Sequence, residues 1–383
     1  MSATTTQANL IPVLLMAREL GFGGIERDVS KFARHLSAFG IQPHVACFNP
    51  GGVRWHEIER AGIPVVRIPV KSFKSPSLFS NGRQLRTYIR ENSIRLVHAF
   101  DDGASIFGVP MARIFGIPAI SSQLCFRELS EPLTRKLMSA VDKVGSGVFV
   151  NCEAVGRYLV SNWNVPERKI HVCYNGFERA EFHPEGRRRP EALRDASVVI
   201  GTVAVLREEK NLPLLVRAFA NVNRRDPKAR LAIVGSGVMK DSLLQLTREL
   251  EISDACVFEE ATQCPAEWMR AIDVFVLTSR SESFSNAMLE AMACGCCPVS
   301  SSVGGMPELI SDGETGFLFE SNNLDKLSDA LCKLALDPSL RERFATQANR
   351  FVYDHLTIEI AAERLASIYK SILKTRADRN GHA

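Results

Sequence analysis

Short apolar runs rich in β-branched residues alternate along the chain with longer segments of helical period. In the first half these runs predict strands at residues 11–16, 42–48, 65–68, 94–99, 119–122 and 147–151. In the second half they predict strands at 198–205, 230–234, 256–258, 274–278, 297–301 and 316–319. Helical patterns lie between them, for example at 25–39 and 81–91. Because strands without a polar face must be covered on both sides, the alternation predicts doubly wound parallel sheets of the α/β class.

The alternation is interrupted once, which indicates two domains. A turn signal at Tyr174-Asn175-Gly176 precedes a polar stretch over 185–190, which is typical of an interdomain linker, and the strand pattern then restarts. We therefore predict Rossmann-like domains at 1–185 and 186–357 in this chain of 383 residues. A last helical pattern at about 358–374 is expected to pack back on the first domain. Ligands bind beyond the carboxyl ends of such strands, so two facing edges would build one site in a cleft.

The charge balance differs between the two predicted domains. The net charge is +4, and the excess of Lys and Arg lies in the first 185 residues, whereas the remainder is slightly acidic. This balance suits an anionic membrane surface or a charged acceptor, with Lys71, Lys74, Arg83, Arg86 and Arg90 as candidate contacts. An ordinary solvated surface is the alternative, and the excess is too small to indicate nucleic acid.

Neither a membrane span nor a signal peptide is predicted. No apolar run reaches about 18 residues, and residues 1–9 lack a basic-then-apolar pattern. We expect a cytoplasmic protein, with at most peripheral contact at the inner face of the membrane. In that reducing compartment the cysteines are expected to be buried hydrophobes, and Cys294, Cys296 and Cys297 lack the spacing of a metal site.

The most informative segment follows the apolar run 274–278. Ser285 is a good N-cap for a helix over 286–293, which Gly295 would end. The first-turn amides and the positive dipole of such a helix suit a phosphate group. Glu290 lies one turn into this apolar helix, where a carboxylate needs donors such as ribose hydroxyls, and Glu282 lies in the preceding loop. The alternative leaves Glu282 exposed and pairs Glu290 with a neighbouring basic residue.

This pair of glutamates, before an Ala-Met-Ala-Cys-Gly helix end, resembles the signature of the family-4 retaining glycosyltransferases, which have the GT-B fold. Other segments match that family in the expected order. They are the glycine-rich loop 21–27, the segments 175–177 and 182–184, the turn 201–211, the loop 234–237 and the run 303–308. The resemblance extends from about residue 11 to 373 and is densest over 170–320. It implies the α/β GT-B fold, with two doubly wound Rossmann-like domains facing across a cleft.

The resemblance implies that the second domain binds the donor, a UDP- or GDP-sugar, without a cofactor. Glu290 would bind the nucleotide ribose, and Ser285 and Asn286 would offer backbone amides to the donor. Gly23 and Gly24, in the acceptor-side first domain, would let the backbone approach the diphosphate without a Cβ in the way.

The charged residues of the resemblance imply how the leaving group departs. Lys210 would neutralise the diphosphate, and Glu282 would lie near the donor sugar. Many family members carry an arginine at the place of Val205, and we expect Arg207 to supply that charge, the alternative being a surface arginine in a turn. No metal is implied, because lysine and helix N-termini supply the positive charge. Asp101-Asp102 also has the wrong spacing for an Asp-x-Asp metal motif.

The acceptor side departs most from the family. Members often have a His-x-His pair where this chain keeps only His98, with Phe100 in the second place, and an Arg or His where it has Gln123. The implied function is transfer of a hexose, with retention, to a glycan or lipid-linked acceptor. Such a reaction belongs to the biosynthesis of cell-surface polysaccharides or glycolipids.

Other functions remain as alternatives. A nicotinamide dehydrogenase would need Gly-x-Gly-x-x-Gly after the first strand, but Glu26 stands in place of the last glycine. A non-catalytic GT-B scaffold fits the departures at Val205, Phe100 and Gln123, although Lys210 and both glutamates oppose it. A sugar-nucleotide epimerase shares the fold, but the glutamate pair and the Gly-Gly loop favour transfer.

Overall fold

The computed structural model describes residues 10–21, 23–73 and 75–380, and these form two compact units. The first unit comprises the chain to Asn175 together with the segment from Ile358, and the second comprises Gly176–Thr357. Phe22, Lys74 and the expectation for residues 1–9 lie outside the described residues. In the described part of the chain, no helix is long and apolar enough to cross a membrane.

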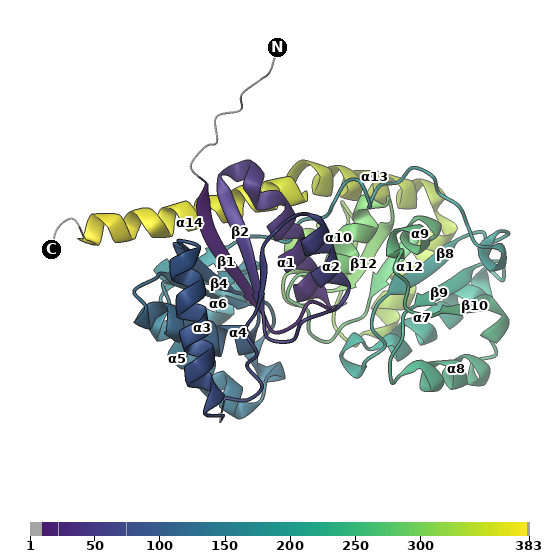
Figure 1. Cartoon of the computed structure of the whole chain (residues 1–383). Helices are drawn as coiled ribbons and strands as arrows, with labels where there is room; N and C mark the ends of the chain where they lie inside the picture. Colours follow the sequence, from purple (N-terminus) through teal and green to yellow (C-terminus); the bar gives the residue numbers. More distant parts are fainter. Residues whose placement is uncertain (1–9, 22, 74, 381–383) are drawn as a thin grey trace, which may run out of the picture. The chain divides into compact units, whose positions relative to one another are not determined.

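The first sheet contains seven parallel strands in the order β3-β2-β1-β4-β5-β6-β7 (Figure 1). The six strands predicted for the first half are confirmed, with ends that shift by one or two residues. The strands are β1 (Ile11–Ala17), β2 (Ile41–Cys47), β3 (Val65–Arg67), β4 (Leu96–Ala99), β5 (Ala119–Gln123), β6 (Gly147–Val150) and β7 (Ile170–Val172). The sequence did not predict β7, because this three-residue edge strand is only half-buried and includes a histidine.

Helices cover both faces of the first sheet, which explains why its strands are apolar throughout. Val13 and Leu15 of β1 belong to one core, whereas Leu14 and Met16 belong to the other. The first core is covered by α1 (Gly24–His35), α2 (Val53–Arg60) and α14 (Ile358–Asn380). The second core is covered by α3 (Ser77–Glu91), α4 (Asp102–Ile114) and α5 (Pro132–Val144). A further helix, α6 (Glu153–Trp163), joins β6 to β7.

The second sheet contains six parallel strands in the order β10-β9-β8-β11-β12-β13. All six predicted strands are confirmed: β8 (Val199–Val203), β9 (Arg230–Val234), β10 (Cys256–Glu259), β11 (Val274–Leu277), β12 (Cys297–Ser301) and β13 (Phe317–Phe319). One core contains side chains of α7 (Leu212–Arg225), α8 (Lys240–Glu249) and α12 (Leu324–Leu336). The helices α9 (Pro265–Ala271), α10 (Asn286–Ala293) and α13 (Pro338–His355) pack together, and α11 (Met306–Leu309) follows β12.

The polar stretch 185–190 is not a free linker, because two of its three arginines are fixed within the second unit. Arg187 and Arg189 both bind the carboxylate of Asp273, the residue before β11, and the Arg189 bond measures 2.6 Å. The two units divide instead at Asn175 and Gly176, within the turn that the sequence shows. The last helix, α14, belongs to the first unit.

Candidate active site

Each sheet has a topological switch point, which is the place between two neighbouring strands where the connection from one strand runs to one side of the sheet and the connection from the other runs to the opposite side. In the first sheet this point lies between β1 and β4, and in the second between β8 and β11. Ligands of open α/β sheets bind at the carboxyl ends of such strands, where the diverging loops leave a crevice. Arg207 and Lys210 follow β8, and Glu282 and Ser285 follow β11, so four predicted site residues flank the switch point of the second sheet.

An ion pair joins the loops that follow β8 and β11. Lys210 Nζ lies 2.7 Å from Glu282 Oε2, and the two side chains are 20% and 15% exposed. Ser279 Oγ donates to the same carboxylate oxygen at 3.1 Å, and Thr278 Oγ1 donates to the Lys210 carbonyl at 2.8 Å. These contacts hold the ammonium of Lys210 in one place at the switch point, since charge-assisted hydrogen bonds are the stronger ones.

Arg207 presents a second cation from the same loop. Its Nε lies 3.1 Å from Glu209 Oε1, and its side chain is 58% exposed. Val205, where the resemblance expects an arginine, is 51% exposed. Both positions face solvent, so a positive charge at either one is accommodated without burial.

The start of α10 is capped as the sequence predicts. Ser285 Oγ accepts a hydrogen bond from the Met288 amide at 3.3 Å, and the helix runs over Asn286–Ala293 before Gly295 adopts φ 84°. The preceding loop is fixed by Ser301 Oγ, which donates to the Ser279 carbonyl at 2.6 Å. The positive end of the helix dipole therefore lies beside the loop that carries Glu282.

Glu290 lies one turn into α10 and is 1% exposed. The end of the same helix is held by Asn349 Nδ2 of α13, which donates to the carbonyls of Met292 and Ala293 at 3.0 and 2.8 Å. Because the helix is held in place, the Glu290 carboxylate can accept hydrogen bonds at a defined position. Burial makes each such hydrogen bond stronger than it would be in water.

The glycine-rich loop after β1 leads directly into α1. Gly23 is the N-cap of that helix and has φ −66°, which any residue adopts, so its backbone conformation does not require glycine. A Cβ at Gly23 would lie 2.0 Å from Glu26 Oε2, and Gly24 is the first helical residue. The Glu26 carboxylate therefore covers the helix start, where the resemblance puts the diphosphate. Burial, with the nearby carboxylates of Glu19 and Asp101, raises the pKa of Glu26.

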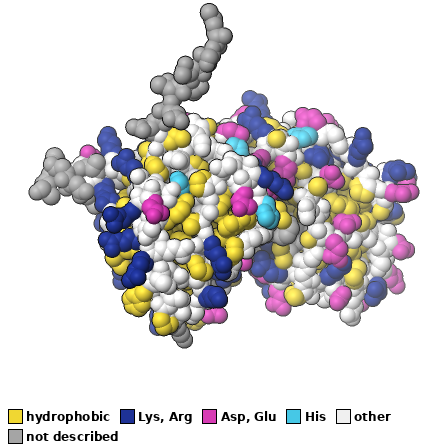
Figure 2. Space-filling view, viewed as in Figure 1, with side chains coloured by type: hydrophobic (Ala, Val, Ile, Leu, Met, Phe, Trp, Pro, Cys, Tyr) yellow, Lys and Arg dark blue, Asp and Glu magenta, His cyan; other side chains and the backbone are white. Residues whose placement is uncertain are grey.

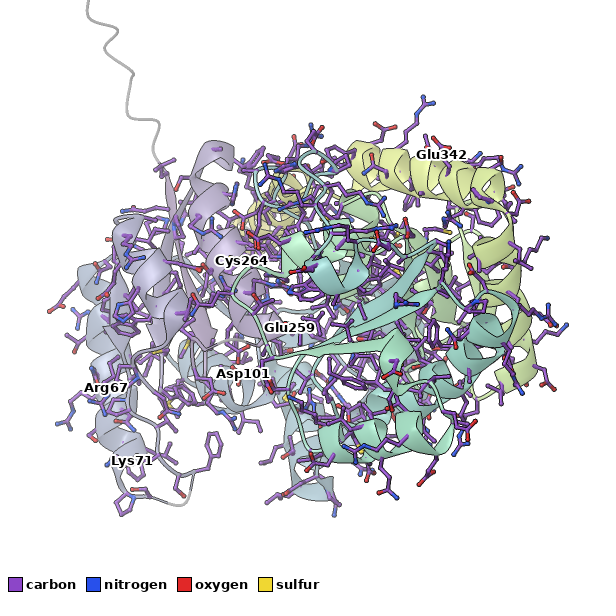
Figure 3. The ribbon with its side chains drawn as sticks, turned by 90° about the vertical axis from the view of Figure 1, so that its right-hand side faces the viewer. Arg67, Lys71, Asp101, Glu259, Cys264 and Glu342 are labelled. Carbon is purple, nitrogen blue, oxygen red and sulfur yellow. The ribbon has the colours of Figure 1, made fainter. Side chains whose placement is uncertain are left out.

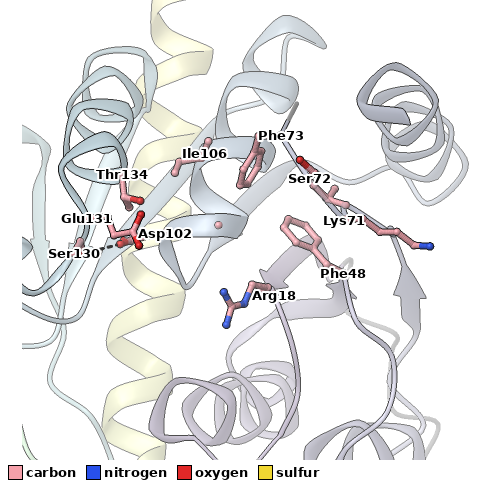
Figure 4. A pocket seen from close by; sticks show the side chains of 12 residues that line it. Arg18, Phe48, Lys71, Ser72, Phe73, Asp102, Ile106, Ser130, Glu131 and Thr134 are labelled. Carbon is pink, nitrogen blue, oxygen red and sulfur yellow. Dashed lines mark hydrogen bonds between the residues drawn. The ribbon is translucent and has the colours of Figure 1, made fainter. Parts of the chain in front are cut away.

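A cavity of about 390 Å³ opens at the carboxyl edge of the first sheet. Its lining comes from the loops that follow β1, β2, β3 and β4 and from the start of α5 (Figure 4). It includes two cations, two carboxylates, three hydroxyls and three large apolar side chains, namely Arg18, Lys71, Asp102, Glu131, Ser72, Ser130, Thr134, Phe48, Phe73 and Ile106. Ser130 Oγ donates to Asp102 Oδ2 at 3.1 Å. The mixture suits a hydroxylated ligand that carries an anionic group.

The described residues contain no group of three or more His, Cys, Asp or Glu side chains that could hold a metal ion. Cys294, Cys296 and Cys297 are buried in the second unit. Cys296 Sγ donates to the Met269 carbonyl at 3.0 Å, so this thiol contributes to packing.

Two family models match the chain. The model described as Glycosyltransferase Family 4 matches residues 22–181, and the model described as Glycosyl transferases group 1 matches residues 185–351. The chain belongs to the family-4, group 1 glycosyltransferases.

Individual glycosyltransferases are similar to this chain over different lengths. The N-acetyl-alpha-D-glucosaminyl L-malate synthase of Bacillus anthracis is 30% identical over 219 residues, which cover 56% of this chain and 57% of that relative. The D-inositol 3-phosphate glycosyltransferase of Pseudarthrobacter chlorophenolicus is 29% identical over 350 residues, covering 85% of this chain and 81% of that relative. The crystal structure of Anabaena Alr3699/HepE in complex with UDP has a TM-score of 0.81 at 20% identity and covers 94% of this chain and 100% of that chain. This similarity confirms the GT-B fold.

In this family-4 chain, the retained His98 and the departure Gln123 both lie in the interior. His98 is fully buried, with Nδ1 2.7 Å from the Tyr369 hydroxyl and Nε2 2.8 Å from Ser122 Oγ. Burial, together with His171, lowers the pKa of His98 to about 3. Gln123 is 1% exposed, and its Oε1 accepts from Arg127 Nε at 2.7 Å. His98 thus fastens α14 to β4, and Gln123 orients an arginine.

Sequence reasoning missed three residues that shape the glycosyltransferase's first unit. Arg127 is 1% exposed, and its Nη2 binds Asp142 Oδ2 at 2.6 Å. Asp101 caps α4 and accepts from the Arg18 amide at 2.5 Å, and Glu26 covers the start of α1. Asp101 had a local signal, since an aspartate before a helical pattern is a good N-cap. Arg127 had none, because its partner lies 15 residues away.

Proposed function

We propose that this chain is a retaining glycosyltransferase that moves a hexose from a nucleoside diphosphate sugar to a glycan or lipid-linked acceptor. The reaction would serve cell-surface polysaccharide or glycolipid biosynthesis. The observation that carries the proposal is the Lys210 ammonium, held by Glu282 at the switch point of the second sheet beside the capped start of α10. A fixed cation and a helix N-terminus stabilise the charge that develops on a departing diphosphate.

The donor is a UDP- or GDP-sugar in this proposal. Glu290 accepts hydrogen bonds from the ribose hydroxyls, and the amides of Ser285 and Asn286 bind the donor. Gly23 and Gly24 bring no side chain to the start of α1, and the diphosphate would displace the Glu26 carboxylate that covers it. The similar Anabaena protein was crystallised in complex with UDP, which supports a uridine nucleotide over a guanosine one.

Glu282 and Lys210 set the stereochemistry of the proposed reaction. A covalent intermediate would need a carboxylate free to attack the anomeric carbon, whereas Glu282 is already bound by Lys210 and Ser279. We therefore propose that the acceptor hydroxyl attacks on the face from which the diphosphate leaves. The bond from the anomeric carbon to the diphosphate oxygen breaks, the bond to the acceptor oxygen forms, and the departing oxygen takes the acceptor's proton. Lys210, with Arg207, stabilises the departing charge, so the step is proposed to need no metal.

The acceptor binds in the cavity of the first unit in this proposal. Arg18 and Lys71 would bind its anionic group, and Asp102 and Glu131 would accept from its hydroxyls. The two relatives are named for L-malate and D-inositol 3-phosphate, which are anions at neutral pH and so support this assignment.

Peripheral contact with an anionic membrane completes the proposal. Of the basic residues predicted for it, Arg83, Arg86 and Arg90 are exposed on α3. Lys71 lies in the loop after β3, whose last residue is Arg67 (Figure 3). Figure 2 shows Lys and Arg side chains mixed with hydrophobic ones over the region of α3.

A donor screen followed by a transfer assay tests the proposal. The chain is warmed with a panel of UDP- and GDP-hexoses, NADH and no ligand, and sugar nucleotides should raise its melting temperature. The stabilising donor is then incubated with glycan and lipid-linked acceptors, with and without EDTA, and the product linkage is determined by NMR. Retention of configuration and full activity in EDTA are expected. An inverted linkage, or recovery of lost activity by Mn²⁺ or Mg²⁺, contradicts the mechanism, and a stable nucleotide complex without transfer to any acceptor favours the scaffold.

A further inference from the structure

The outer face of α5 is apolar, although it faces solvent. Leu133, Leu137, Ala140 and Val144 recur at spacings of four, three and four residues, so they form one stripe along the helix. Leu133, Leu137 and Val144 are 62%, 36% and 47% exposed. The opposite side of the helix already covers the sheet, because Met138 and Val141 are buried. The stripe is therefore a second apolar face, which packing within the first unit does not explain.

The apolar surface continues beyond both ends of α5. Leu129, just before the helix, is 61% exposed, and Ile114, at the end of α4, is 72% exposed. Arg113 Nε donates to the Val144 carbonyl at 3.1 Å, which brings the end of α4 beside the end of α5. Five of the twelve exposed large hydrophobic side chains among the described residues lie on this surface. Exposed apolar residues gathered in this way mark an interaction surface.

The charges on the same face of α5 are all positive. Lys136 and Lys143 lie seven residues apart, so both are exposed along the same edge of the stripe. The only acidic residue of the helix, Asp142, is buried and bound to Arg127. Nearby, the Arg86 guanidinium of α3 lies 5.9 Å from the centre of the Phe115 ring, directly after α4. An apolar stripe with lysines along one edge complements an anionic lipid surface, in which leucines enter the acyl boundary and lysines bind head groups.

We infer that the outer face of α5, with Leu129 and Ile114, docks the protein on an anionic membrane. Ser130, Glu131 and Thr134, at the start of this helix, also line the cavity of the first unit. Docking through α5 would therefore bring the cavity mouth to the head-group level. The inference rests on the proposed function in one respect, since it specifies a lipid-linked acceptor held in that membrane. The arginines of α3 add charge, but α5 carries the apolar contact.

Vesicle flotation tests the surface without any need for activity. The full chain is mixed with vesicles of phosphatidylcholine alone or with one-third phosphatidylglycerol, at low and at physiological salt. We expect flotation with the anionic vesicles and little with the neutral ones. Leu133→Gln with Leu137→Gln should weaken binding at least tenfold, and Lys136→Gln with Lys143→Gln roughly fivefold per lysine at low salt. The matched control, Leu336→Gln with Lys326→Gln on the exposed side of α12, should bind like the wild type.

Several outcomes overturn the inference. Equal flotation of the wild type with and without anionic lipid refutes it, and so does an equal loss in the α12 control. If light scattering shows that the wild type is a dimer and the leucine variant a monomer, while neither floats, the face binds a second copy instead. Transfer activity with a water-soluble acceptor separates this inference from the proposed function. Vesicle binding without transfer refutes only the function, and transfer without vesicle binding refutes only the docking surface.

Discussion

The two sheets share the order of their first strands, yet their switch points carry different chemistry. In the second sheet, Lys210 and Glu282 meet at 2.7 Å and their loops are fixed by Thr278 and Ser279. In the first sheet, the same place is a cavity whose cations and carboxylates come from separate loops. The fold thus determines where a ligand binds, whereas the loops determine which ligand. A fixed positive charge suits the diphosphate, which all nucleoside diphosphate sugars have in common. A cavity built from loops can differ between relatives, and so can bind different acceptors.

The comparison makes Lys210 the residue with the largest expected effect on rate. Lys210→Ala should lower kcat by about 10²–10³ and raise the donor KM by less, because the charge matters most as the diphosphate departs. Steady-state kinetics with the donor found by the screen measure both constants. Lys240→Ala is the matched control, since Lys240 lies at the same sheet edge and pairs with Glu260. A raised KM with unchanged kcat would reduce Lys210 to a binding residue.

His98 should affect stability rather than chemistry, although it stands at the end of a strand beside the first switch point. Because burial lowers its pKa to about 3, the folded state binds fewer protons than the unfolded state below about pH 6.5. The stability that neutral His98 contributes is therefore complete above pH 6.5 and is lost as the pH falls towards 3. At pH 4.5 the free energy of unfolding should be lower by about 3 kcal/mol than at neutral pH.

Hydrogen exchange measures this loss locally, in the amides of β4 and α14. The wild type should lose protection there between pH 7.5 and 4.5, after correction for intrinsic exchange rates, whereas His98→Gln should be less protected at pH 7.5 but change less with pH. The measured kcat of the two proteins at pH 7.5 should agree within a few-fold. A large fall in kcat with unchanged protection would make His98 part of the site.

A substitution at Glu290 tests whether the site on the second sheet binds the ribose of the donor as well as its diphosphate. Glu290→Gln should weaken donor binding by about 1.5–3 kcal/mol, because a charged acceptor for ribose hydroxyls becomes neutral. Calorimetry with the nucleoside diphosphate alone is enough to measure it, and Glu249→Gln on the exposed side of α8 serves as control. Donor affinity equal to that of the wild type would exclude the ribose contact.

The smallest expected effect lies in the first-sheet cavity. Arg18→Ala should raise the acceptor KM about tenfold and leave the donor KM unchanged, since one exposed charge-assisted contact contributes about 1.5 kcal/mol. The control is Arg95→Ala, an exposed arginine directly before β4 at the opposite edge of the sheet. A change of the same size in the donor KM would mean that Arg18 binds the diphosphate. The acceptor would then not be the only ligand of the first-sheet cavity, which contradicts the division of roles between the two sheets.

Local patterns in the sequence predicted most of the secondary structure. Twelve strands were visible as apolar runs, and α10 was predicted with its N-cap and its end, because Ser285 and Gly295 act through neighbouring residues. The strand β7 was missed because an edge strand buries too little to need a continuous apolar run. The arginines at 187 and 189 were misjudged as part of a linker because their partner, Asp273, lies more than 80 residues away.

The sequence by itself determined the doubly wound α/β class, the family resemblance and the identities of the candidate site residues. Only the tertiary structure decided which of them meet. It placed the Lys210 ammonium on Glu282, 72 residues further along the chain, and buried His98 against Tyr369, 271 residues away. It also placed the Glu26 carboxylate over the start of α1 and left an apolar stripe of α5 facing solvent. The physical reason is range: strand periodicity and helix caps act over a few residues, whereas ion pairs and burial depend on which strands the chain brings together.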